Sequence, residues 1–118
     1  MQAEKRERLE KAGIDVSGAL ERFMGNDALL ERFLNKFLSD ANYEKLTAAM
    51  DAGDKETALT AAHTLKGVCG NLSMTELFDL LTKQVAAFRA EDWDGAKALM
   101  PSIILAYGQI VDAIKGLN

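Results

Sequence analysis

The chain has 118 residues, of which 48% are hydrophobic and 27% are charged, a balance typical of one soluble globular domain. Fourteen basic and eighteen acidic residues give a net charge of −4, and the dispersed basic residues argue against nucleic acid or an anionic membrane as a partner. The single cysteine excludes an intrachain disulfide and fits a reducing compartment. No apolar stretch approaches the roughly 18 residues of a membrane span, so we expect a cytoplasmic protein.

The first residues are highly charged and helix-prone but carry little apolar surface. We therefore expect residues 1–12 to form a polar N-terminal extension or a linker helix, and residues 13–118 to form the domain. Gly13 ends the polar segment, and Asp15 or Ser17 is placed to cap a short helix that carries Val16 and Leu20.

The middle of the chain shows the most regular helical pattern. Apolar residues recur at three- and four-residue spacing from Leu29 to Met50, which predicts one long amphipathic helix of about six turns. A tight turn at residues 51–54 follows, and Asp54 is a suitable N-cap for the helix beyond it.

Two further helices are predicted in the second half. The spacing of Ser73 and Glu76 matches a capping box, which would open an amphipathic helix that ends after Phe88. Asp92 is expected to cap the last helical region, and Pro101 to kink or divide it. Since no segment alternates as a strand would, we predict an all-α fold, an up-and-down four-helix bundle with a short N-terminal accessory helix.

The only histidine, His63, points away from the apolar face of its predicted helix. At about 100° per residue, the apolar residues of this segment form one stripe on the opposite side; they are Ala58, Ala61, Leu65, Val68, Cys69 and Leu72. Cys69 is therefore expected to be a buried and inert thiol. Lys66, Gly67 and Gly70 share the exposed side with His63, and glycines inside a helix cost about 1 kcal/mol each relative to alanine.

The residues around His63 favour phosphoryl transfer over other chemistry of histidine. Hydrolysis by serine or cysteine would need a nucleophile and an orienting acid, and a zinc site would need more ligands than one histidine and one buried cysteine. A neutral imidazole is a good nucleophile near pH 7, and phosphoryl transfer asks mainly for positioning and for neutralisation of charge. Lys66 could supply the charge, and the glycines could supply steric access. The alternatives are that Gly70 simply begins the helix terminus and that the histidine is an incidental surface residue.

The segment from His63 through Lys66 and Gly67, followed by Gly70-Asn71-Leu72, resembles the signature of histidine-containing phosphotransfer (HPt) domains. Residues 13–16 and 52–54 are also similar to that family, and the likeness covers roughly Ile14 to Ile114. The resemblance implies a four-helix bundle, so residues 13–118 would be an HPt-like bundle domain.

The resemblance also implies roles for particular residues. His63 would accept a phosphoryl group from a receiver-domain aspartyl phosphate and pass it reversibly to another receiver. Lys66 would contact the phosphate, and Gly67 would leave room for it. A polar residue on the next helix often orients the imidazole in this family; by ungapped spacing that position is Val85, which cannot do so.

The expected partners are receiver domains of response regulators or of hybrid histidine kinases, and the chain is expected to be a monomer. Leu59, about 40° from His63 on the helix, is a candidate for the docking surface, and Gly70, Lys83 and Gln84 are further candidates. No cofactor and no metal site are expected in this chain, since any Mg²⁺ would belong to the receiver.

Two other functions remain open at this point. The chain could be a non-catalytic helical adaptor that binds receiver or kinase domains, or the phosphoacceptor module of a larger hybrid histidine kinase. Autonomous kinase activity is not expected, because Thr64 follows the histidine where kinase dimerisation helices usually carry an acidic residue.

Overall fold

Eight helical segments and no strands make up the computed structural model, which describes all 118 residues. They are α1 (Ala3–Lys11), α2 (Val16–Arg22), α3 (Asp27–Phe37), α4 (Asn42–Ala52), α5 (Lys55–Asn71), α6 (Thr75–Arg89), α7 (Trp93–Ala98) and α8 (Met100–Lys115).

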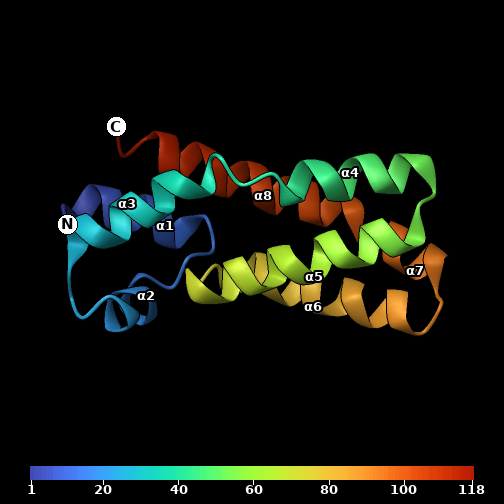
Figure 1. Cartoon of the computed structure of the whole chain (residues 1–118). Coiled ribbons are helices and arrows are strands. Elements are labelled where there is room, and N and C mark those ends of the chain that lie inside the picture. Colours follow the sequence, from blue (N-terminus) through green and yellow to red (C-terminus); the bar gives the residue numbers. More distant parts are fainter.

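The segments assemble into a four-helix bundle whose first and last long helices are each divided in two. The α3–α4 pair, α5, α6 and the α7–α8 pair run along the length of the molecule (Figure 1). Within it α5 packs against α4 and α6, while α8 packs against α6 and α3. The predicted all-α bundle is confirmed, and the short α1 and α2 lie at one end of it (Figure 1).

The predicted single helix from Leu29 to Met50 is wrong. α3 ends at Phe37 and α4 begins at Asn42, because the Asp40 carboxylate accepts hydrogen bonds from the Asn42 backbone N–H and side-chain amide, both at 2.9 Å. An aspartate that binds a backbone N–H two residues ahead offers the chain an alternative to helix. The apolar pattern runs on across the break because both halves line the same core.

The predicted capping box at Ser73 is also wrong. Ser73 adopts a left-handed conformation with φ of 54°, and α6 is preceded by Met74, which makes no side-chain cap. The Ser73 hydroxyl instead accepts a hydrogen bond from the Arg22 guanidinium at 3.2 Å, and its carbonyl accepts one from the Asp15 N–H at 2.8 Å. The turn between α5 and α6 is therefore tied to α2.

Other predicted helix ends are confirmed. The carboxylates of Asp15, Asp54 and Asp92 each accept a hydrogen bond from the backbone N–H three residues ahead, at the starts of α2, α5 and α7. Pro101 lies in the first turn of α8, just after the break at Leu99, so the last helical region is divided as expected.

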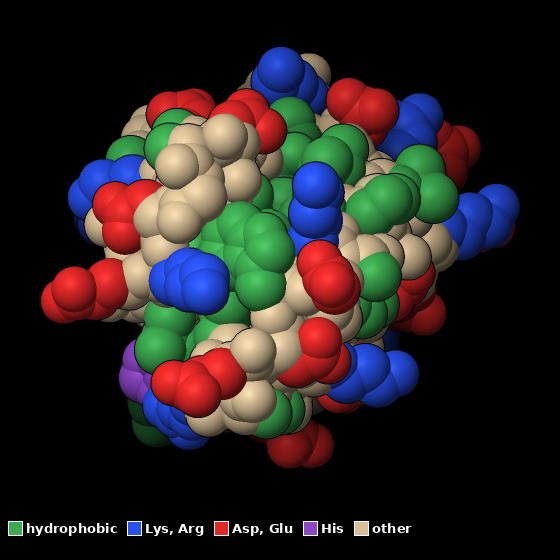
Figure 2. All heavy atoms as spheres, turned by 90° about the vertical axis from the view of Figure 1, so that its right-hand side faces the viewer, with side chains coloured by type: hydrophobic (Ala, Val, Ile, Leu, Met, Phe, Trp, Pro, Cys, Tyr) green, Lys and Arg blue, Asp and Glu red, His purple; other side chains and the backbone are tan.

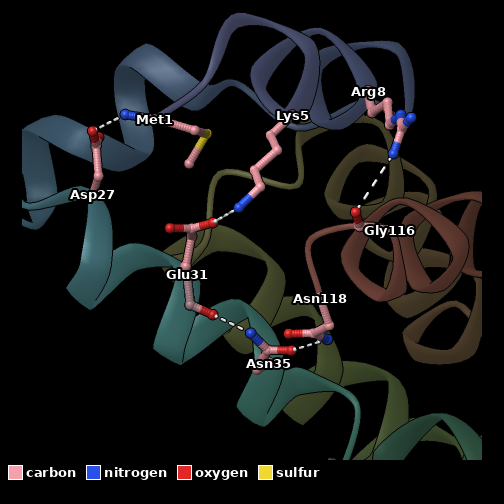
Figure 3. Close-up of polar contacts among 8 residues, drawn as sticks. All are labelled: Met1, Lys5, Arg8, Asp27, Glu31, Asn35, Gly116 and Asn118. Carbon is pink, nitrogen blue, oxygen red and sulfur yellow. Dashed lines mark hydrogen bonds and ion pairs between the residues drawn. The ribbon is translucent and has the colours of Figure 1, made fainter.

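The N-terminal segment packs on the bundle rather than extending from it. Leu9 of α1 is fully buried against the core, and the Arg8 guanidinium donates a hydrogen bond to the Gly116 carbonyl at 3.5 Å (Figure 3). Lys5 forms an ion pair with Glu31 of α3 at 3.4 Å. The division of the chain at residue 12 stays a prediction, although these residues share one core with the bundle.

The segment from Trp93 to Lys115 is long enough to cross a membrane, and its most apolar 18-residue window has a mean hydropathy of 1.2, although no uninterrupted apolar run reaches that length. In this structure its inner face carries the fully buried Ile103, Ile110 and Ile114. Packing in the bundle accounts for the apolar residues of this inner face, although only 33% of the most apolar part of the segment is buried.

Cys69 is fully buried on α5, and burial, with a smaller contribution from the Asp40 carboxylate, raises the pKa of its thiol to about 12. Since the thiolate is the reactive form, we expect no reaction of the folded protein with a disulfide reagent such as DTNB at about pH 8. The same thiol should react fully in denaturant. Rapid labelling of the folded chain would contradict the burial of this residue.

Candidate functional site

α5 carries the histidine and presents it to solvent. The buried face of this helix consists of small and apolar residues, which are Ala58, Ala61, Ala62, Leu65 and Cys69. His63 lies on the opposite side and is exposed, as its phase in the sequence predicted. The residues that α5 buries against α4 and α6 therefore determine that His63 faces solvent.

Lys66 lies one turn beyond His63 and is half-buried. Its ammonium group stands 5.7 Å from the centre of the Phe78 ring on α6, a cation–π contact. The sequence did not indicate Phe78 as a site residue, because its spacing predicts only that it belongs to the apolar face of its helix. The structure places a positive charge near the histidine, with its side chain resting on an aromatic ring.

The two glycines of α5 differ in their surroundings. A Cβ atom at Gly67 would meet nothing within 4 Å, so the surface one turn from His63 is open. A Cβ atom at Gly70 would lie 3.2 Å from the Phe78 ring, closer than side chains normally approach. Packing of α5 against α6 therefore explains the glycine at position 70, and contact with a partner is not needed to explain it.

No hydrogen bond from another side chain orients the His63 ring. Val85, the position expected from spacing, is buried and apolar. Gln84 is also fully buried, and its amide donates to the Ala96 carbonyl at 3.1 Å. Packing of α6 against α7 holds this side chain inside the bundle, so it presents no surface to the partner that the sequence led us to expect. Lys83, by contrast, is exposed on α6.

A hollow of about 570 Å³ lies beside the start of α5, and Leu59 is part of its wall. It is lined by Lys55, Glu56, Leu59, Phe88, Glu91 and Trp93. The rings of Phe88 and Trp93 pack at 6.0 Å between centres, so apolar surface is exposed within a charged rim. Figure 2 shows hydrophobic side chains gathered on this end of the molecule, with the histidine at the edge of the view.

The sequence did not single out Phe88 or Trp93 for this hollow. Phe88 continues the apolar pattern of α6, and Trp93 reads as the start of the next core helix. The two residues meet only because the turn between α6 and α7 brings the helix ends together. No group of three or more histidine, cysteine or acidic side chains is placed to hold a metal ion.

The family model described as the Hpt domain matches residues 28–116, which include α5 and its exposed histidine. The chain therefore belongs to the Hpt domain family, whose role is histidine phosphotransfer in two-component signalling, with receiver domains as general partners. Comparison with curated proteins and with solved structures gave no match.

The start of α5 depends on the Asp54 cap, which gives a pH-dependent prediction. The hydrogen bonds from the Thr57 hydroxyl and backbone N–H lower the pKa of Asp54 below its ordinary value. The stabilisation it contributes is therefore complete above the unfolded pKa and is lost as the pH falls through the lower, folded value. We expect Asp54→Ala to lower the melting temperature at about pH 7 and the deficit to shrink at about pH 3. Asp51→Ala, one turn earlier and exposed, serves as the control, and an equal deficit at both pH values would contradict the cap.

The difference between the two glycines predicts opposite tolerance of a methyl group. Gly67→Ala should stabilise the fold by about 0.5–1 kcal/mol, because alanine favours helix and nothing obstructs its Cβ. Gly70→Ala should gain less or lose stability, because the Phe78 ring must shift. Urea unfolding of both variants measures this, and equal gains would show that Gly70 has no packing role.

Proposed function

We propose that this chain is a phosphorelay intermediate in which His63 accepts a phosphoryl group from the aspartyl phosphate of one receiver domain and passes it to the aspartate of another. In the first step a ring nitrogen of His63 forms a bond to phosphorus, while the bond from phosphorus to the aspartate oxygen breaks. The carboxylate leaves with the electron pair, and the second transfer is the reverse of this step on another receiver.

The observation that carries the proposal is the exposure of His63 on the outer face of a central helix, within the segment that continues to Lys66 and Gly67. An in-line displacement needs an unobstructed path to the nucleophile. The open surface at Gly67 supports such a path, since even a methyl group there meets no neighbour within 4 Å.

Lys66 is the residue we expect to stabilise the charge that develops on the transferring group. Transfer passes through a loose transition state whose negative charge is spread over the phosphoryl oxygens, and a nearby fixed cation lowers its energy. The Lys66 ammonium contacts the Phe78 ring on α6 and forms no ion pair with an acidic residue, so its charge is available to the transferring group.

The hollow beside Leu59 supports the receiver-docking part of the proposal. Its apolar floor, with Phe88 and Trp93, lies toward the start of the helix that carries the histidine, and interfaces of this kind combine an apolar centre with a polar rim. Lys83 on α6 is a further candidate for contact. We expect exchange with cytoplasmic response regulators or hybrid kinases, and therefore a cytoplasmic site of action.

The test is incubation of the chain with a panel of phosphorylated receivers from the source organism. Label that is acid-labile and base-stable should appear on the wild-type chain and be absent from His63→Gln, because glutamine offers no nucleophilic ring nitrogen. Lys66→Ala should slow transfer by about tenfold or more. Lys11→Ala, an equal loss of charge on α1, is the control and should transfer at the wild-type rate.

Persistent labelling of His63→Gln would overturn the assignment of the nucleophile. Absence of label on the wild-type chain, with receiver binding that is the same for wild type and His63→Gln, would instead identify a non-catalytic adaptor. Circular dichroism of each variant verifies that the bundle is intact.

A further inference from the structure

The outer face of α7 and α8 is an exposed apolar surface that the proposed phosphotransfer does not use. Leu99, which separates the two segments, keeps right-handed helical dihedral angles, so α7 and α8 together form a nearly continuous helix from Trp93 to Lys115 that is interrupted only at Leu99. Ile104 is 48% exposed and Leu105 is 64% exposed near the middle of this helix. No charged residue lies between Lys97 and Asp112.

Beside the exposed Ala98, Ser102 and Gln109, eight residues of this face form one narrow stripe. At about 100° per residue they fall within an arc of about 100°. From one end to the other they are Asp94, Lys97, Pro101, Ile104, Leu105, Gly108, Asp112 and Lys115, seven of them exposed and Gly108 half-buried. We call this set the α8 stripe.

Packing within the chain does not explain why the middle of this stripe is apolar or why it contains a glycine. A Cβ atom at Gly108 would meet nothing within 4 Å, so packing does not require glycine there, although glycine weakens a helix. None of the four charged members of the stripe takes part in the ion pairs of the structure, which join residues of α1 and its neighbours.

The order of residues along the stripe is complementary to itself in the antiparallel direction. A two-fold axis between Ile104 and Leu105 sets these two residues opposite each other across a pair of helices. The same axis sets Pro101 opposite Gly108, where the missing side chain leaves room for the proline ring. It also sets Lys97 opposite Asp112.

One turn further out, the same axis also sets Asp94 opposite Lys115. Both outer charge pairs are therefore of opposite sign, and each occurs twice in a symmetric dimer. A surface that meets its own copy must be complementary to itself in this way.

We propose that the α8 stripe binds the same stripe of a second copy of this chain, in an antiparallel dimer with two-fold symmetry. This differs from the monomer expected from the sequence. Contact along one helix face covers less than the roughly 1,200 Å² of a standard interface, so the dimer is weak and depends on concentration. The charges at both ends of the stripe favour a second copy over a lipid surface.

The dimer leaves the phosphotransfer site free. α5 packs against α4 and α6 and lies across the bundle from α8, which packs against α3 and α6. Two copies joined through α8 would each keep His63 available to a receiver.

The experiment is sedimentation equilibrium of the full chain at concentrations from about 10 µM to about 1 mM, a range suited to weak association. The average mass of the wild type should rise toward that of a dimer. Leu105→Glu, which places a charge at the axis, should weaken association at least tenfold. Lys45→Glu on α4 makes the same change in charge as Lys97→Glu and should leave association unchanged.

The register is tested by charge reversal. Lys97→Glu alone and Asp112→Lys alone each set like charges opposite each other and should weaken the dimer. An equimolar mixture of the two variants should restore the dimer, because position 97 of each copy then again faces a residue of opposite charge at position 112 of the other. All these positions are exposed, so the variants should fold.

Three results would overturn the proposal. They are a monomeric wild type at all concentrations, association that Leu105→Glu does not change, and failure of the mixture to exceed the two variants alone. Sedimentation of a monomeric chain with phosphatidylcholine and phosphatidylglycerol vesicles, lost in Leu105→Glu, would show instead that the stripe binds lipid.

Discussion

The packing of α5 between α4 and α6 is the constraint on which the rest of this molecule depends. The helix buries three alanines together with Leu65 and Cys69, so its backbone lies close to both neighbours. Small residues on this face leave no freedom to rotate the helix without burying a polar side chain or exposing the core. The exposure of the histidine follows from this, since it lies directly across the helix from the buried face.

How far the sequence predicts the fold depends on whether a feature is local. The phase of α5, its Asp54 cap and the division at Pro101 are properties of neighbouring residues, and all three were predictable. The break at Asp40 was not, because apolar residues recur at helical spacing on both sides of it. Ser73 was misread for a related reason, since its hydroxyl meets Arg22, which lies far away in the sequence.

The residues of the candidate site also differ in how far the sequence could predict them. The sequence was sufficient for His63, Lys66 and Gly67 as neighbours on one helix face. It did not indicate Phe78 beneath Lys66, Trp93 beside Leu59 or the burial of Gln84, because each depends on how different helices pack together. Patterns of spacing describe one helix at a time, whereas the support around a site comes from several.

The contacts of α1 with the other end of the chain have a consequence for how the molecule opens. α4, α5 and α6 are consecutive and joined by short turns, so the hairpins around the acceptor helix close small loops at little entropic cost. The contact between Arg8 and Gly116 joins residues 108 positions apart through an exposed hydrogen bond, so it closes a long loop for little gain. Local opening should therefore begin where α1 meets α8, while the hairpin with the histidine exchanges its amide hydrogens last. The acceptor helix would then belong to the most persistent unit of the fold.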